Sequence, residues 1–159
     1  MDKLDPQLFR NTLGSFASGV TVVTAKIGDD IHGMTANAFI SVSLEPPLIL
    51  VSVAKKATMH DFLTRGQLYG VSILAEDQAA YSNHFAGWEQ EGLEPQFFYK
   101  GETPLLSGAV AHLVAEVVDP HEAGDHTLYI GKVKHLAYDD ARAPLLYFKG
   151  KYGHYTQTD

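Results

Sequence analysis

Short segments rich in β-branched residues, separated by turn residues, recur along most of this 159-residue chain. The predicted strands are residues 20–26, a return strand from Ile31 after the turn at 28–30, and residues 48–54, 68–74, 109–118, 127–138 and 145–147. These six or seven strands, with only three predicted helices among them, do not fit the alternation of a doubly wound parallel sheet. We therefore expect a mainly β fold, an antiparallel β-barrel with peripheral helices, with residues 1–159 forming a single domain.

A helix is expected near the N-terminus, because Asp5 can cap it and Pro6 fits the first helical position. We expect this helix to end at Ser18-Gly19. Its apolar residues recur at helical spacing and form one face, which we expect to pack on another surface. The residues of this face are Leu8, Phe9, Leu13 and Phe16, with Thr12 between them.

Further along the chain, residues 48–54 are apolar on both faces, which predicts a central strand after the rigid Glu45-Pro46-Pro47. Two short helices should follow. Thr58 is expected to cap the first, and Glu76 or Asp77 to begin the second, which closes at Gly87. Residues 88–104 have no regular pattern and are interpreted as a lid or a contact surface.

The stretch from His32 to Pro47 interrupts the strand pattern with small residues and short hydrogen-bonding residues. Its core, Gly-Met-Thr-Ala-Asn-Ala at positions 33–38, lets the backbone approach a flat ligand closely and offer it N–H and hydroxyl groups. The simpler interpretation is a polar turn between strands. The composition of this stretch alone does not favour ligand binding. The motifs that the rest of the chain contains and lacks, described below, are what favour it.

Composition excludes several kinds of function. The net charge of −7 argues against a broad nucleic-acid surface, and the absence of cysteine excludes disulfides, thiolate metal sites and cysteine nucleophiles. No Gly-x-Gly-x-x-Gly follows a strand and no phosphate-binding loop motif occurs. The eight histidines show no pair at metal-ligand spacing on one predicted helix, so no metal site is expected. No membrane span or targeting segment is predicted, so we expect a cytoplasmic protein.

Three local features remain as candidates for binding. Residues 52–58 contain hydroxyls, Lys55, Lys56 and a helix start, which suit a phosphate but equally suit a strand end with solvated lysines. His126 follows Asp125 where a turn enters a strand, a common place for an exposed histidine. Phe85 is interpreted as a core aromatic when considered alone, and so is the tyrosine at position 152.

Five motifs, in order along nearly the whole chain, resemble the short-chain flavin reductases, the reductase components of two-component monooxygenases such as phenol and 4-hydroxyphenylacetate hydroxylases. They are Phe-Arg-Asn at 9–11 with Phe-Ala-Ser-Gly-Val-Thr-Val-Val-Thr at 16–24; residues 33–39 with Ser-Val-Ser-Leu-Glu-Pro-Pro at 41–47; Asn-His-Phe-Ala-Gly at 83–87; Gly-Asp-His-Thr at 124–127; and Leu-Leu-Tyr-Phe-Lys-Gly-Lys-Tyr at 145–152. The resemblance is weakest at residues 88–106.

The resemblance implies an FMN-binding split β-barrel of Greek-key antiparallel topology, working as a homodimer with flavin near the subunit interface. By the same resemblance, the isoalloxazine would be contacted, mainly through backbone groups, by Thr35, Ala36, Asn37 and Ala38, and the same wall would continue with Ser52, Val53 and Ala54. The phosphate would be bound by Lys55, Lys56 and Thr58, and the outer face of the cofactor would be flanked by Phe85, Ala86 and Gly87. His126 would help to seat the nicotinamide, and Tyr152 would close the site. Lys56 departs from the family pattern, in which a small or hydroxylated residue is common.

The implied activity is hydride transfer from NADH or NADPH to FMN or FAD, with reduced flavin passed to a partner oxygenase. This reaction needs no protein nucleophile, which agrees with the residues present, because the cofactor carries the chemistry. The alternative is a non-catalytic flavin-binding sensor or carrier on the same barrel. An oxidase of a phosphorylated amine is disfavoured because the chain lacks a further arginine cluster. The sequence does not separate FMN from FAD, NADH from NADPH, or a prosthetic flavin from a substrate flavin.

Overall fold

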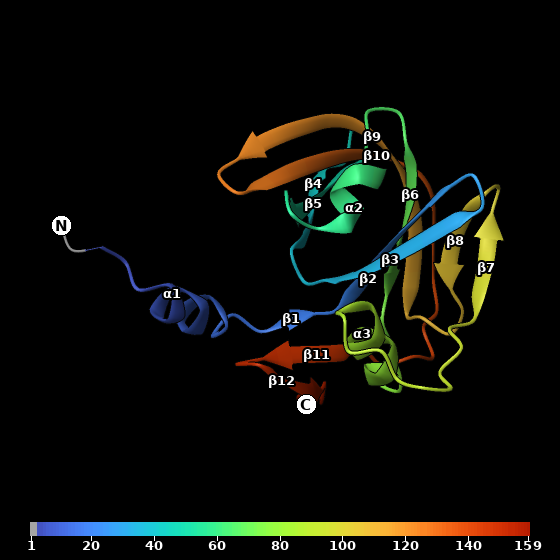
Figure 1. Ribbon diagram of the computed structural model, residues 1–159. Helices are drawn as coiled ribbons and strands as arrows, with labels where there is room; N and C mark the ends of the chain where they lie inside the picture. Colours follow the sequence, from blue (N-terminus) through green and yellow to red (C-terminus); the bar gives the residue numbers. More distant parts are fainter. Residues whose placement is uncertain (1–2) are drawn as a thin grey trace.

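The computed structural model describes residues 3–159 and consists mainly of antiparallel strands (Figure 1). The main sheet has seven strands, in the order β3 (Asp30–Ala36), β2 (Thr21–Ile27), β6 (Leu68–Ile73), β9 (Ala111–Ala123), β10 (His126–Tyr138), β5 (Leu48–Ala54) and β4 (Phe39–Ser43). The smaller sheets are β1 (Ser18–Gly19) with β11 (Leu145–Phe148) and β12 (Lys151–His154), and β7 (Phe97–Lys100) with β8 (Thr103–Leu106). The helices are α1 (Pro6–Leu13), α2 (Thr58–Phe62) and α3 (Ala79–Phe85).

The main sheet curls around an apolar core that the inward side chains of its strands supply. Val23, Val51, Val71, Tyr69 and Tyr129 are all fully or almost fully buried in it. Strand β6 lies between β2 and β9, so the β2–β3, β4–β5 and β9–β10 hairpins are joined by crossing connections rather than as a simple meander. The expected mainly β, antiparallel barrel is confirmed.

The expectation that β5 is central and buried on both faces is wrong. Its side chains alternate, with Ile49, Val51 and Val53 buried and Leu48 and Leu50 only half-buried. Strand β4 lies beyond it at the edge of the sheet. The outer face of β5 is apolar, yet no element in the described part of the chain, residues 3–159, covers it. Sequence periodicity cannot tell such a face from a buried one.

Helix α1 is shorter than expected and its apolar face is exposed. It ends at Leu13, because Gly14 caps it and donates its N–H to the carbonyl of Arg10 at 2.8 Å. The predicted end at Ser18-Gly19 is instead strand β1. Phe16 is 80% exposed, and α1 projects away from the barrel (Figure 1). Nothing between residues 3 and 159 supplies the surface on which this face was expected to pack.

Three smaller expectations also need correction. The N-cap of α2 is Ala57 rather than Thr58, which is the first helical residue, and the N-cap of α3 is Gln78 rather than Glu76 or Asp77. The segment from 88 to 104 is not wholly irregular, because its last part forms the β7–β8 hairpin. Among residues 3–159, no helix has the length and apolar character needed to cross a membrane.

Candidate functional site

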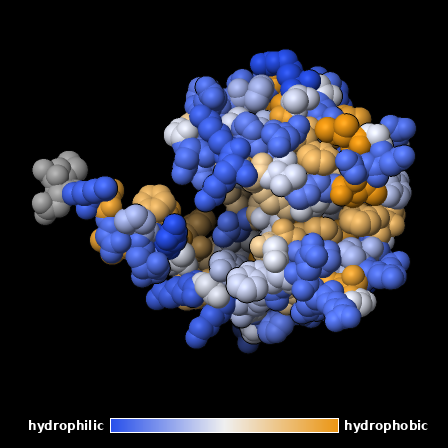
Figure 2. Space-filling view, in the orientation of Figure 1, coloured by the Kyte–Doolittle hydropathy of each residue, from blue (hydrophilic) through white to orange (hydrophobic). Residues whose placement is uncertain are grey.

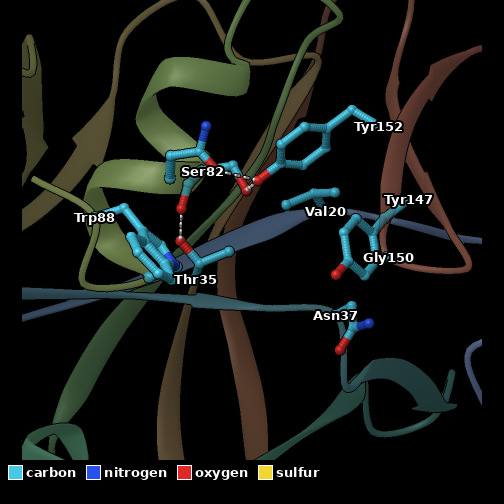
Figure 3. A pocket seen from close by; sticks show the side chains of 10 residues that line it. Val20, Thr35, Asn37, Ser82, Trp88, Tyr147, Gly150 and Tyr152 are labelled. Atoms are coloured by element: carbon cyan, nitrogen blue, oxygen red, sulfur yellow. Dashed lines mark hydrogen bonds between the residues drawn. The ribbon is translucent and has the colours of Figure 1, made fainter. Parts of the chain in front are cut away.

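A pocket of about 480 Å³ lies between the end of β3, helix α3 and the β11–β12 hairpin (Figure 3). It is lined by Val20, Thr35, Asn37, Ser82, Asn83, Ala86, Trp88, Tyr147, Gly150 and Tyr152. These residues come from four separate regions of the sequence. Four of them, Thr35, Asn37, Ala86 and Tyr152, are among the site residues that the resemblance implies.

The alternation of β3 determines which of its residues can reach the pocket. Ala36 is buried and belongs to the barrel core, and its carbonyl accepts a hydrogen bond from the Thr21 hydroxyl at 2.6 Å. Thr35 and Asn37 therefore point to the opposite, outer face. The Thr35 hydroxyl donates to the Ser82 carbonyl at 2.6 Å, which joins α3 to β3 at the edge of the pocket. Ala36 can contribute only its backbone to a ligand there.

Tyr152 is held by two hydrogen bonds to α3. Its hydroxyl donates to the Asn83 side-chain oxygen at 2.9 Å and lies 2.7 Å from the Ser82 hydroxyl (Figure 3). Because the tyrosine proton goes to Asn83, the Ser82 hydroxyl donates to the tyrosine oxygen. The ring is thereby fixed between α3 and the C-terminal hairpin, facing the pocket.

The loop between β3 and β4 presents free backbone donors. The N–H groups of Asn37 and Ala38 lie outside the strands and donate no hydrogen bond to any residue between 3 and 159. The carbonyl of Ala38 accepts the N–H of Ser52 at 3.1 Å, which places β5 directly beside this loop. Two adjacent donors and an amide side chain suit a flat heterocycle with carbonyl and ring-nitrogen acceptors along one edge, so this donor set fits the pyrimidine side of a flavin.

Further residues that the resemblance places at the site lie beyond this loop, on β5 and on the neighbouring strand β10. Val53 is buried in the core, so Ser52 and Ala54 face outward and Val53 offers only backbone. Ala54 is paired with His126 across the β5–β10 ladder, and the N–H of Lys55 donates to the Asp125 carbonyl at 2.9 Å. The structure thus places Ser52, Ala54 and His126 on one face, although none of them lines the 480 Å³ pocket.

The imidazole of His126 is oriented by its neighbour. Its Nδ1 lies 2.8 Å from the Asp125 carboxylate, which fixes the ring and leaves Nε2 available. The hydrogen bond to His126 and the charge on that ring lower the pKa of Asp125. The carboxylate accepts a hydrogen bond from the ring at Nδ1 and so orients the imidazole.

The predicted phosphate residues lie at the start of α2 rather than in the pocket. Lys55 Nζ forms an ion pair with Glu122 at 3.2 Å, whereas Lys56 and Thr58 are exposed. The charge on Lys56 also contributes to the lowered pKa of Asp125. The two lysines therefore already face acidic groups, which a bound phosphate would have to displace or share.

Phe85 supports the site from beneath rather than lining it. A Cβ atom at Gly33 would lie 2.5 Å from its ring, so the absence of a side chain on β3 is what allows the ring to pack there. Phe85 also packs on the second core cluster, at 6.3 Å between ring centroids from Phe97. Gly87 follows α3 with a φ of +98° and does not line the pocket.

Sequence reasoning missed several lining residues. Asn83, Tyr147 and Gly150 lie within motifs that carry the resemblance, so a signal for them was present. Ser82 and Trp88 had none, because a serine in a short helix and an exposed tryptophan in an irregular segment do not indicate a pocket.

Trp88 gives a direct measure of binding. It is the only tryptophan of the chain, lines the pocket and is 75% exposed. We expect a flavin in this pocket to quench its fluorescence, since the two ring systems would lie in contact. Titration with FMN checks this, with denatured protein at the same flavin concentration as the control for absorption. Unchanged Trp88 emission at saturating flavin would place the ligand elsewhere.

Comparison with known proteins gives a consistent result. The flavin reductase like domain matches residues 13–156. An NADH-dependent flavin reductase from Rhodococcus sp is 48% identical over 157 residues, covering 94% of this chain and 89% of that protein. The reductase component of 4-hydroxyphenylacetate 3-monooxygenase from Thermus thermophilus is 38% identical over 146 residues, covering 92% of this chain and 94% of that protein.

Solved structures agree with these relatives. Flavin reductase PheA2 in its native state superposes with a TM-score of 0.92 at 44% identity, covering 97% of this chain and 100% of that one. The NADH:FAD oxidoreductase SgcE6 from Streptomyces globisporus, in complex with NAD and FAD fragments, superposes with a TM-score of 0.86 at 36% identity, covering 98% of each chain. The arrangement of the barrel, the free donors after β3 and these matches lead to one conclusion: the chain belongs to the flavin reductase-like domain family.

Proposed function

We propose that this chain is an NADH-dependent flavin reductase, a single domain that reduces FMN or FAD and releases the product to a partner oxygenase. The observation that carries the proposal is the pair of free N–H groups at Asn37 and Ala38, beside a pocket closed by Tyr152. Relatives with this activity in their names support it, among them one named as an NADH-dependent FAD reductase and one named as an FMN reductase.

In this proposal the protein binds and orients its reactants and performs no covalent chemistry. A bound flavin would supply the hydride-accepting chemistry, with a reduced nicotinamide as the donor. Asn37 and Ala38 hold the ring edge through their backbone, with Thr35 fixing the strand against α3. His126, kept in one orientation by Asp125, seats the nicotinamide on the open side. Holding two rings in contact can remove roughly 7–11 kcal/mol of entropic barrier.

The test measures NADH consumption by the purified protein with excess FMN, FAD or riboflavin, and flavin bleaching by NADH under anaerobic conditions. We expect NADH consumption that depends on added flavin. A protein that binds flavin but never oxidises NADH or NADPH would be the sensor or carrier instead. A protein that binds no flavin would contradict both interpretations.

Homodimerisation is part of the proposal, because no element among residues 3–159 covers two of the apolar surfaces. Strand β4 exposes Ile40 and Val42 beside the outer face of β5, and α1 exposes Leu8 and Phe9. Figure 2 shows apolar side chains on the segment that projects away from the rest of the chain. Exposed apolar areas of this kind mark interfaces. A second copy would cover both, and would approach the loop of Asn37 between them. Light scattering is expected to give twice the mass of the chain, and a monomer at micromolar concentration would contradict it.

A partner oxygenase is proposed by analogy with relatives named as reductase components of monooxygenases acting on 4-hydroxyphenylacetate and 4-nitrophenol. Because the donor would be NADH, the proposed reaction takes place in the cytoplasm. The oxygenase substrate is left open, since no residue of the pocket identifies it.

We expect Lys55→Ala to weaken FMN binding roughly three- to tenfold while leaving riboflavin binding unchanged, because only FMN offers a phosphate to the ammonium group. Trp88 quenching measures both affinities. Glu122→Gln, which frees Lys55 from its ion pair, is expected to strengthen FMN binding and serves as the matched opposite change. Equal losses for FMN and riboflavin would show that Lys55 does not contact the phosphate.

A further inference from the structure

The two sides of the 480 Å³ pocket differ in their chemistry. Asn37 lines one side, where its own N–H and that of Ala38 are free and its amide adds further polar groups. Trp88 lines the pocket with the apolar faces of an indole, and Ala86, two residues earlier, also lines it. In Figure 3, Asn37 and Trp88 lie on opposite sides of the pocket. A flat ligand that reaches both therefore needs one polar end and one apolar end.

The backbone of Trp88 is fixed by the end of α3. Its N–H donates to the carbonyl of Asn83 at 2.9 Å, and Gly87, with a φ of +98°, makes the left-handed turn that brings the chain back to this bond. The side-chain oxygen of the same Asn83 accepts the Tyr152 hydroxyl at 2.9 Å. One residue of α3 thus positions the aromatic residues of two walls of the pocket.

The fold does not require an indole at position 88. Trp88 is 75% exposed and belongs to neither of the two apolar core clusters. Removing an exposed side chain of this kind changes stability little. The family motifs do not require it either, because Trp88 begins the segment in which the resemblance is weakest. The position of this side chain on the pocket is therefore best explained by contact with a ligand.

The charge of the segment after Trp88 determines which end of a ligand can lie there. Three exposed carboxylates of this segment form no ion pair with any residue between 3 and 159, and they belong to Glu89, Glu91 and Glu94. Their negative charge disfavours a phosphate on this side of the pocket. The predicted phosphate residues, Lys55 and Lys56, precede α2 instead. Trp88 is therefore placed to receive an uncharged, apolar end.

We propose that Trp88 determines the orientation of the flavin, by binding the dimethylbenzene end of the isoalloxazine while the donors at Asn37 and Ala38 bind the pyrimidine end. This inference rests on the proposed flavin reductase function for the identity of the ligand. The dimethylbenzene end carries no hydrogen-bonding group, so an indole packed against its two methyl groups leaves no polar group unpaired. Trp88 is thus a specificity-determining residue that selects flavins carrying both methyl groups.

The probes are riboflavin and 7,8-didemethylriboflavin, which lacks only the two methyl groups of the benzene ring. Neither probe carries a phosphate, so the lysines before α2 do not influence the comparison. We expect the unmodified protein to bind riboflavin about five- to fifteenfold more tightly than the analogue, since burying one methyl group is worth roughly fourfold in affinity. Equilibrium dialysis without NADH measures both dissociation constants.

Three variants assign this preference to the indole. Trp88→Ala is expected to bind the two flavins about equally, because the methyl groups then have no apolar partner, and Trp88→Phe should keep part of the preference. Tyr138→Ala is the matched control, since Tyr138 is also 75% exposed but does not line this pocket, and it should keep the full preference. All three variants should melt near the temperature of the unmodified chain, which separates a lost contact from a lost fold.

Failure of this inference can be distinguished from failure of the proposed function. A preference for riboflavin that persists in Trp88→Ala, or equal binding of both flavins by the unmodified protein, would overturn the inference even if NADH oxidation is normal. An absence of NADH oxidation with every flavin would overturn the proposed function, while dialysis would still decide the role of Trp88 because it needs no NADH. A protein that binds neither probe would overturn both.

Discussion

Replacing His126 by alanine is expected to lower kcat/KM for NADH by about tenfold to a hundredfold while leaving the flavin dissociation constant nearly unchanged. The imidazole is fixed by Asp125 at 2.8 Å and lies next to Ala54 on the outer face of the sheet, away from the free donors of the loop after β3. Its loss would leave the nicotinamide poorly oriented without disturbing the flavin ring. Stopped-flow reduction of bound flavin measures the effect.

The His126 experiment has an internal control in Asp125→Asn. This variant keeps the ring but replaces its charged acceptor, so we expect a smaller loss than for His126→Ala. His154→Ala, an exposed histidine on β12 that does not line the pocket, should behave as the unmodified protein does. Unchanged reduction kinetics in His126→Ala would remove this residue from the site.

Replacing Gly131 by alanine is expected to destabilise the fold by about 1–3 kcal/mol, because a Cβ atom there would lie 2.1 Å from the Tyr69 hydroxyl. Both residues lie in the barrel interior, where Tyr69 is fully buried and its hydroxyl has no hydrogen-bond partner between residues 3 and 159. Burial raises the pKa of Tyr69, so the group stays neutral. Urea unfolding measures the change in free energy.

Tyr69→Phe makes this a double-mutant cycle. Alone, it removes an unsatisfied buried hydroxyl and is expected to stabilise the fold by about 1 kcal/mol. Combined with Gly131→Ala, it should recover part of the loss and not all of it, since the ring carbon would still lie 2.9 Å from the new Cβ. Gly19→Ala, with no atom within 4 Å of its Cβ, is the neutral control. Additive effects in the cycle would contradict the proposed contact.

The sequence predicted most strands of the main sheet because their inner faces are decided by local pattern, but it missed β4, which lies inside the stretch interpreted as an interruption. It also failed where a face has no partner among residues 3–159. The apolar outer face of β5 made a strand beside the sheet edge look central. Helix α1 likewise carries an apolar face that no residue from 3 to 159 covers. Hydrophobic periodicity shows that a face is apolar, but it does not show which molecule packs against that face. The β7–β8 hairpin was missed because its strands are short, Gly101 lies between them and Pro104 lies within β8, and neither residue type indicates a strand.

The site could be predicted only in part, for a similar reason. Asn37 was recognisable because small and polar residues interrupt a strand pattern there. Ser82 reaches the same pocket through a hydrogen bond of its carbonyl to Thr35, 47 positions earlier in the chain, which no local pattern encodes.

The hydrogen bonds of Tyr152 to Ser82 and Asn83 bring together segments about seventy positions apart, and β12, which carries Tyr152, follows every strand of the main sheet in the sequence. A growing polypeptide on the ribosome could thus form most of the barrel and still lack one wall of the pocket. Flavin binding in this pocket would therefore require residue 152 to have been synthesised, because shorter chains would lack the Tyr152 wall.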